Sequence, residues 1–356
     1  MTILFVGPDP SGRGGAARSL RRLTRSLQSV GHRVCICHPD ETLFPDEVIQ
    51  DGRRRRFGGD RSLPRWVDEV LAAAAHTSPD LVVGWYASAG GFCAVTAAKL
   101  LGLPVVVCLR GNDVDRDFLT PDRHAIVRYT MAQADALTAV STEMADKVAA
   151  WVGRRPVFIA NGVDRTVFFP DPAAGAVFHR AQGLSSDAPV LGMFGEFKPK
   201  RGLDRLRRWG GMGWQILLVG HVRPSVARSV PSDACVVPTI TDDDVLRGAY
   251  NACDVVIQPS VHDGMPNVVL EAMACGRAVV GSAVGGMRDA IVDGQTGRLC
   301  VTDAEWRAAL LDVSSKAVAA ALGAAAVHGP STLEEERRAF ERVCVRVRRG
   351  VRERGG

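Results

Sequence analysis

The sequence has no apolar stretch long enough to cross a membrane as a helix. Its longest apolar runs, such as residues 103–109, fall well short of the roughly 20 residues that a spanning helix needs. Met1 leads directly into the strand-like run ILFV, so we expect neither a secretory signal nor a membrane anchor. No internal repeat is evident. These absences favour a soluble globular protein.

Cysteine pairs with C-x-x-C spacing are also absent, although the chain has nine cysteines. Cys35, Cys37 and Cys108 lie in apolar strand-like runs, where buried free thiols are common. This pattern favours a reducing cytoplasm, and it leaves open a peripheral position at the inner face of the membrane.

The net charge is not extreme, at +5, but the arginines are clustered. The run Arg53–Arg56 continues through Arg61 and Arg65 with only one aromatic residue, Phe57, among the arginines, and this lack of aromatic interleaving argues against nucleic acid. A solvated face and contact with an anionic membrane or a phosphate-bearing acceptor both remain open. The C-terminal cluster consists of Arg346, Arg348, Arg349, Arg352 and Arg354.

Apolar β-branched runs alternate with helical patterns along the chain, which predicts an α/β protein with parallel sheets. With 356 residues and 46% hydrophobic content, the chain is long enough for two such domains. The linker-like segment 161–175 carries Pro170, so we place the domains at residues 1–170 and 171–332. Strands are predicted at residues 2–6, 33–37, 80–84, 104–109, 136–140 and 157–159, and then at 190–194, 215–219, 235–237, 255–258 and 278–281.

The final segment, residues 333–356, is predicted as a helix. Phe340, Val343, Val347 and Val351 recur at helical spacing among charged residues, which is typical of a helix that packs on a domain surface.

Two acids, Asp263 and Glu271, stand eight positions apart around a turn and a helix start. Pro266 suits the first helical turn, whose N–H groups at Asn267, Val268 and Val269 would face an anion. A diphosphate bound there would leave both carboxylates near ligand hydroxyls. The alternative is structural: Asp263 caps the helix, and Glu271 faces solvent.

A glycine loop follows the first predicted strand. Gly12, Gly14 and Ala17 satisfy the G-x-G-x-x-A dinucleotide fingerprint, which would indicate an NAD-dependent dehydrogenase. However, residues 7–11 separate the loop from its strand, and the second strand ends near His38 rather than at an acid.

The segment SVHDGMPNVVLEAMACG, residues 260–276, resembles the nucleotide-sugar signature of family 4 retaining glycosyltransferases, which have the GT-B fold. The resemblance covers nearly the whole chain. It implies two doubly wound Rossmann-like domains facing a cleft, a final helix that crosses back to the first domain, and transfer from a nucleoside diphosphate sugar without a metal or other cofactor. Further matches in the expected order are GGAARSL, GHRV, ADALTAVS, NGVDRTVFFP and GGMRDAIVDGQTGRL.

The resemblance also implies roles for individual residues. Asp263 and Gly264 would meet the donor sugar, and Glu271 would bind the ribose. The glycine pair Gly14 and Gly15 would let the backbone approach the diphosphate. The backbone amides that would contact the phosphates are those of Asn267, Val268 and Val269.

Four positions depart from the family pattern. Arg110 stands where many members have His, and we expect its guanidinium to read an anionic group on the donor or acceptor. Asp263 replaces a Glu. Glu196 replaces an Arg and Arg201 a Lys in the loop after residues 190–194, where cations stabilise the leaving diphosphate and Lys198 could supply the missing charge.

The sequence thus predicts a hexosyltransferase that uses a sugar, lipid-linked or small-molecule acceptor in cell-envelope polysaccharide or glycoconjugate synthesis. A sugar-nucleotide-binding protein without catalysis is the main alternative, because Arg110, Glu196 and Asp263 are altered. We predict no metal site: Asp242, Asp243 and Asp244 precede a helical pattern, where acids favour the helix N-terminus. Asp113, Asp115, Asp117 and His221 are likewise not expected to bind a metal or the nucleotide.

Overall fold

A computed structural model describes residues 1–12, 14–38, 41–43, 55–56, 62–209 and 212–355. Packing divides the chain into two compact units. Unit 1 comprises Met1–Asn161 and Leu333–Gly356, and unit 2 comprises Gly162–Thr332. The division therefore falls at Asn161, ahead of the position near residue 170 that the linker composition indicated. Of the arginine run at residues 53–56, Arg53 and Arg54 lie outside the described residues, as does Arg61.

The described strands of unit 1 form an eight-stranded sheet in the order β4-β3-β2-β1-β5-β6-β7-β8. All neighbouring pairs are parallel except those that β3 makes with β2 and β4. The central strands β1, β5 and β6 are apolar and buried on both faces apart from Thr2, as expected when helices cover a parallel sheet. The strands are β1 (Thr2–Val6), β2 (Arg33–His38), β3 (Glu41–Leu43), β4 (Arg55–Arg56), β5 (Leu81–Trp85), β6 (Val105–Leu109), β7 (Ala136–Ala139) and β8 (Val157–Phe158).

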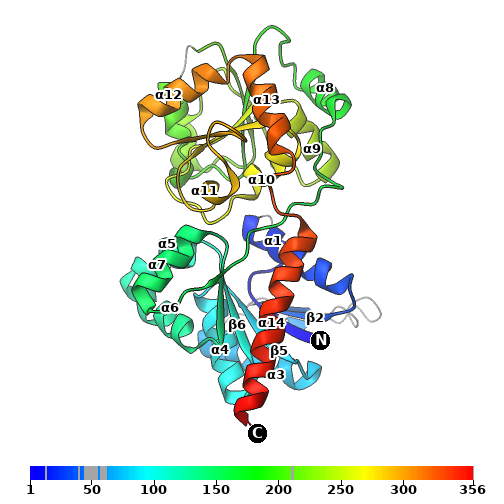
Figure 1. Cartoon of the computed structure of the whole chain (residues 1–356), viewed down its shortest axis with the longest axis vertical. Coiled ribbons are helices and arrows are strands. Elements are labelled where there is room, and N and C mark those ends of the chain that lie inside the picture. The colour runs from blue at the N-terminus through cyan, green and yellow to red at the C-terminus, as the bar shows by residue number, and fades with distance from the viewer. Residues whose placement is uncertain (13, 39–40, 44–54, 57–61, 210–211, 356) are drawn as a thin grey trace. The chain divides into compact units, whose positions relative to one another are not determined.

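Helices cover both faces of this sheet, and the last helix of the chain is one of them (Figure 1). In α14, Phe340, Val343 and Val347 are buried against the face formed by Phe5 and Trp85, so three of the four positions of the predicted packing stripe are confirmed, whereas Val351 is only half-buried. The helices of unit 1 are α1 (Gly15–Gln28), α3 (Leu63–Thr77), α4 (Ala89–Leu101), α5 (Asn112–Asp115), η1 (Asp117–Leu119), α6 (Pro121–Gln133), α7 (Thr142–Val152) and α14 (Leu333–Gly355).

Unit 2 contains a six-stranded parallel sheet in the order β11-β10-β9-β12-β13-β14. Its strands are β9 (Val190–Phe194), β10 (Gln215–Val219), β11 (Cys235–Val237), β12 (Val255–Gln258), β13 (Ala278–Ser282) and β14 (Arg298–Cys300). Its helices are α8 (Pro172–Ala181), η2 (Pro199–Arg201), η3 (Leu203–Arg208), η4 (Pro224–Ser229), α9 (Asp243–Asn251), α10 (Asn267–Ala274), α11 (Met287–Ala290), α12 (Asp303–Asp312) and α13 (Lys316–Ala326).

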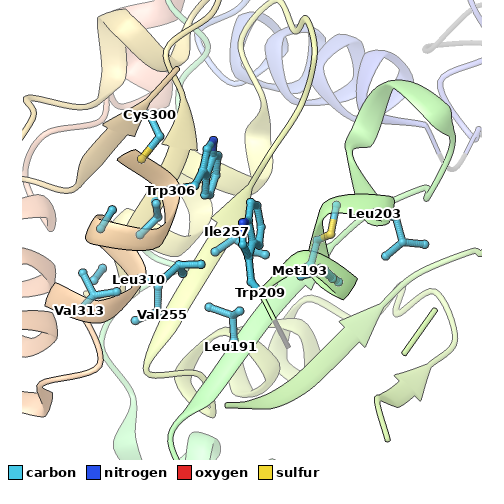
Figure 2. Close-up of a cluster of buried hydrophobic side chains, with 14 of the residues drawn as sticks. Leu191, Met193, Leu203, Trp209, Val255, Ile257, Cys300, Trp306, Leu310 and Val313 are labelled. Carbon is cyan, nitrogen blue, oxygen red and sulfur yellow. The ribbon is translucent and has the colours of Figure 1, made fainter. Parts of the chain in front are cut away.

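The core of unit 2 is organised by side chains that alternate along β9. Leu191 and Met193 join a cluster in which Trp209 and Trp306 stack with ring centroids 4.7 Å apart (Figure 2). Phe194 points to the opposite face, where its ring stacks on Tyr250 of α9 at 4.2 Å. Packing on both faces fixes the position of β9. It therefore also fixes the start of the loop that follows β9, which belongs to the candidate site.

Among the described residues, no single helix is both long and apolar enough to cross a membrane. The pair α12 and α13 passes the same length and composition test only when taken together, and it is bent by 99° at its break.

Candidate active site

The candidate donor residues of unit 2 gather at one edge of its sheet. Strands β9, β12 and β13 are neighbours and parallel, so their carboxyl ends meet at the same edge. The loops that follow them carry Glu196 to Gly202, Ser260 to Pro266, and Gly285 with Gly286. This edge is where ligands bind in open α/β sheets.

Close backbone approach shapes the loop after β9. Gly195 has φ +105°, and its N–H donates to the Val219 carbonyl at 2.9 Å. A Cβ on Gly220 would lie 1.9 Å from the Gly195 carbonyl oxygen, so only glycine fits there. A Cβ on Gly195 would meet only Val268 Cγ2, at 4.0 Å. The backbone of Gly195 therefore runs beside the first turn of α10.

Glu196 is held between two cations. Its carboxylate accepts from Lys198 Nζ at 2.9 Å and from Arg223 Nε at 2.6 Å. Burial disfavours the charged form of Glu196, but the hydrogen bonds from Lys198 and Arg223 outweigh it and hold the pKa of Glu196 below its usual value. Two positive charges against one negative charge leave this loop cationic, although Glu196 stands where the resembled family has Arg.

Arg201 and Asp263 form an ion pair. Arg201 Nη1 donates to Asp263 Oδ2 at 2.5 Å, and the two side chains are only 18% and 14% exposed. Gly202, at φ +71°, lets the chain turn against the β12 loop, since a Cβ there would lie 2.2 Å from the Pro259 carbonyl oxygen. The loops after β9 and β12 are thus fastened together, and Arg201 orients the carboxylate of Asp263.

The glycine pair after β13, Gly285 and Gly286, packs directly against the backbone of the turn at Asp263 and Gly264. The N–H of Gly286 donates to the Gly264 carbonyl at 2.5 Å. A Cβ on Gly285 would lie 1.7 Å from the Asp263 carbonyl oxygen, and one on Gly286 would lie 2.4 Å from that of Gly264. Both glycines are therefore required by packing, and together they set the position of Asp263.

The first turn of α10 presents backbone donors without a capping side chain. The N-cap is Pro266, not Asp263, so the structural alternative for Asp263 is wrong. The N–H of Val269 donates to the Pro266 carbonyl at 3.1 Å, which corrects the expectation that this amide faces a phosphate. Within the described part of the chain, the Val268 amide has no protein acceptor, and the Val268 side chain lies beside Gly195, with Cγ2 4.0 Å from where a Gly195 Cβ would be. Val268 is thus the best-placed of the three amides.

Glu271 is buried, so the alternative in which it faces solvent is also wrong. It is 1% exposed, and its carboxylate accepts a hydrogen bond from the Tyr250 hydroxyl at 2.8 Å. Tyr250 is itself buried against Phe194. A carboxylate held in this way is pre-oriented for hydrogen bonds to ligand hydroxyls. No sequence motif connects Tyr250 with Glu271, because Tyr250 reaches it from another helix, α9.

Arg110 belongs to unit 1, whereas the residues above belong to unit 2. Its guanidinium lies 4.2 Å above the centre of the Trp85 ring and donates to Asn161 Oδ1 at 2.5 Å. Burial lowers the pKa of the Arg110 guanidinium, and attraction to Glu336 of α14 opposes this shift. The side chain is therefore positioned by an aromatic face, an amide and a buried carboxylate.

Asp113 is a positioning residue that the sequence reading considered only as a metal ligand. It is fully buried, and its carboxylate accepts from the amides of Ala87 at 3.0 Å, Gly111 at 2.9 Å and Arg110 at 3.1 Å. Burial raises the pKa of Asp113, and these backbone donors oppose the rise. One side chain thereby fixes the loops after β5 and β6. The only sequence signal is an aspartate shortly after a glycine in the loop that follows a predicted strand.

Gly14 caps α1 in an extended conformation, with φ −75° and ψ 157°. A Cβ on Gly14 would meet no protein atom within 4 Å, so packing among the described residues does not explain the glycine. Gly15 begins α1.

Asp242 caps α9 by accepting from the amides of Asp244 and Val245, and Asp244 pairs with Arg247. In the described ranges, no group of three or more His, Cys, Asp or Glu residues is placed to hold a metal ion.

Known proteins resemble both halves of this chain. A model described as Glycosyltransferase Family 4 matches residues 13–167, and one described as Glycosyl transferases group 1 matches residues 189–316. A GDP-mannose-dependent alpha-mannosyltransferase of Mycolicibacterium smegmatis is 28% identical over 81% of both chains. An alpha-maltose-1-phosphate synthase of the same organism is 26% identical over 76% of this chain and 73% of that one.

Solved structures with the same fold include a sucrose-phosphate synthase from Thermosynechococcus elongatus, with a TM-score of 0.79 and 20% identity over 99% of this chain and 98% of that one. Anabaena HepE in complex with UDP and glucose also has a TM-score of 0.79, with 18% identity over 97% of this chain and 99% of that one. The two domains are those of the GT-B fold. The chain belongs to the family 4 glycosyltransferases and is a hexosyltransferase that uses a nucleotide-sugar donor.

Proposed function

We propose that this enzyme transfers a hexose from a nucleoside diphosphate hexose with retention of configuration and without a metal ion. The donor would bind at the edge of unit 2, and the acceptor would be held mainly by unit 1. The single observation that carries the proposal is the Arg201–Asp263 pair beside the uncapped first turn of α10. It places a cation, a carboxylate and a backbone donor together.

In this proposal the leaving diphosphate faces Gly195, the Val268 amide, Lys198 and Arg201. Breaking the sugar–phosphate bond builds negative charge on the diphosphate, which positioned cations and amides stabilise more strongly than they stabilise the bound donor. This supports transfer without a metal. The leaving phosphate would help to deprotonate the acceptor hydroxyl on the same face of the sugar, as the family resemblance implies.

The two carboxylates have separate tasks. Asp263, oriented by Arg201, would accept hydrogen bonds from the donor-sugar hydroxyls. Glu271, held by Tyr250, would accept them from the ribose. Because Asp263 is one methylene shorter than the Glu of the resembled family, its fixed position above the Gly285 turn is needed to keep it within reach of the sugar.

Two measurements test these assignments: binding of the nucleoside diphosphate and of its sugar conjugate, and turnover of that sugar conjugate. Glu271→Ala should weaken binding of the free nucleoside diphosphate, whereas Asp263→Asn should leave that binding nearly unchanged and weaken the sugar conjugate. Arg201→Ala should lower kcat by roughly 10²-fold, as is typical when one donor to a developing anion is lost. A product of inverted configuration, or activity abolished by a chelator, would contradict the proposed chemistry.

Arg110 is proposed to contact an anionic group of the donor or acceptor with the part of its guanidinium not used by Asn161. The planar guanidinium of Arg110 stacks on the Trp85 ring, and the ammonium group of a Lys cannot reproduce this contact. Arg110→Lys should therefore change turnover and substrate preference. If it changes neither, the assignment is wrong.

The acceptor is proposed to be part of cell-envelope polysaccharide or glycoconjugate synthesis, and lipid-linked acceptors are included. Nine free cysteines support a cytoplasmic location, and exposed arginines of α14 support peripheral contact with an anionic membrane face. The test is pelleting with vesicles of phosphatidylcholine and phosphatidylglycerol. Replacing Arg342, Arg346 and Arg349 with Glu should abolish pelleting; if it does not, the contact is excluded.

A further inference from the structure

Unit 2 has a pocket at the edge of the sheet opposite the candidate donor site. It is lined by Asp254 and Arg277, which directly precede β12 and β13, whereas the donor residues follow these strands. Its volume is about 380 Å³. That volume is sufficient for a small organic ligand.

Two cations line this pocket. Arg277 donates Nε to the Cys275 carbonyl at 3.1 Å and Nη1 to the Cys253 carbonyl at 3.3 Å, so its side chain is held in place by backbone alone. Lys316, at the start of α13, is exposed. Within the part of the chain that the structure describes, neither cation makes an ion pair with a carboxylate. The carboxylate of Asp254, in turn, accepts from the Val190 amide at 2.8 Å.

The remainder of the lining is apolar apart from His328. Pro170, Val327 and a row of alanines on α13 form the wall. Gly276, at φ +69°, has no side chain to fill the base of the pocket, where a Cβ would lie 3.3 Å from Pro170 Cγ. The backbone of His328 is fixed because Arg165 donates to its carbonyl at 2.9 Å. The alanines in the lining are Ala319, Ala320 and Ala324.

We propose that this pocket binds a small phosphorylated compound, with the phosphate between Arg277 and Lys316 and the carbon skeleton on the alanine and proline wall. Arg277 and Lys316 outnumber the single carboxylate of the lining, Asp254, so the pocket carries a net positive charge that attracts an anion. The apolar wall adds affinity that free phosphate would not gain. The site is separate from the donor site and does not depend on the function proposed above.

Phenyl phosphate is a suitable probe because it combines both features, and calorimetric titration measures its binding. Ala320→Glu places a carboxylate in the pocket on an exposed helical position, where Glu is well tolerated. Ala321→Glu makes the same change one position on, at an exposed residue outside the lining, and is the matched control. Lys316→Ala removes one cation.

The expected result is saturable binding of phenyl phosphate that Ala321→Glu leaves unchanged. Ala320→Glu and Lys316→Ala should each weaken it at least about tenfold, which corresponds to about 1.4 kcal/mol. Inorganic phosphate and phenol should bind more weakly than phenyl phosphate. Equal binding by Ala320→Glu and Ala321→Glu, no saturable binding to the wild type, or loss of binding in Arg201→Ala instead would each overturn the proposal. The last outcome would place the probe in the donor site.

Discussion

The substitution Gly285→Ala tests how Asp263 is positioned. The added Cβ would lie 1.7 Å from the Asp263 carbonyl oxygen, where real Cβ contacts are essentially never under 3.0 Å. The Asp263 turn must therefore move by about 1.3 Å or more. A displacement of about 1 Å at a substrate-positioning residue can cost roughly 10²-fold in rate, equivalent to about 2.7 kcal/mol of transition-state stabilisation. We expect kcat/KM for the donor to fall by that order.

The backbone strain of the same substitution can be measured separately with Gly294→Ala. Gly294 has φ +73°, and a Cβ there would meet no atom within 4 Å. Gly294→Ala should lose roughly 1 to 2 kcal/mol of stability, because alanine is disfavoured at positive φ, and Gly285→Ala should lose at least as much, because its Cβ also clashes with the Asp263 carbonyl. Only Gly285→Ala should also lose catalytic activity, measured as turnover at a temperature where both variants are folded. Equal kcat/KM for the two variants would refute the idea that Gly285 positions Asp263.

Three further outcomes follow from the site and the core. Tyr250→Phe removes the hydroxyl that donates to the buried Glu271, so it should destabilise the protein by roughly 2 kcal/mol and weaken nucleotide binding, as melting curves and calorimetry would show. The pKa of Glu196 is lowered, so its ion pairs add stability that is present above the usual value of 4.5 and is lost as pH falls through the lowered pKa. The stability difference from Glu196→Gln, on the order of 0.5 kcal/mol after solvent screening, should vanish over that range. An aromatic disulfide reagent should modify one thiol of the native protein, Cys235, because it is partly exposed whereas the other eight cysteines are buried out of reach of the reagent. Burial raises the pKa of Cys235 as well, so the modification should be slow.

Apolar strands could be predicted from the sequence, including the three-residue strand Cys235–Val237, whereas a short strand with a charged residue could not. Val190–Phe194 and Gln215–Val219 match the predicted ranges because a run buried on both faces has a distinctive composition. Arg298–Cys300 was missed, since three residues with one arginine form a strand only through pairing with β13. Such pairing depends on the fold and not on local sequence.

The division between the units shows a similar limit. Gly162, Pro170 and Pro172 mark a linker by composition, yet the contacts of unit 2 begin at Gly162. Phe168 is already buried, with its ring against Tyr250 at 6.0 Å. Composition identifies where the chain turns, whereas packing determines where a compact unit begins.

For the candidate site, the sequence identified the charged residues but not their partners. Asp263, Glu271, Lys198 and Arg201 were all selected from motifs. The pairing of Arg201 with Asp263 spans 62 positions along the chain, and no local pattern predicts such a contact. The supports at Tyr250, Gly285 and Asp113 were missed for the same reason.

The most direct test of the central claim is a metal-free thermal-shift comparison of nucleoside diphosphates, their sugar conjugates and NAD. At about 100 times its dissociation constant, a ligand adds roughly 2.7 kcal/mol to the stability of the native state. The account predicts stabilisation by one nucleoside diphosphate, greater stabilisation by one of its sugar conjugates, and loss of both in Glu271→Ala. Stabilisation by NAD alone, or a shift unchanged in Glu271→Ala, would contradict it.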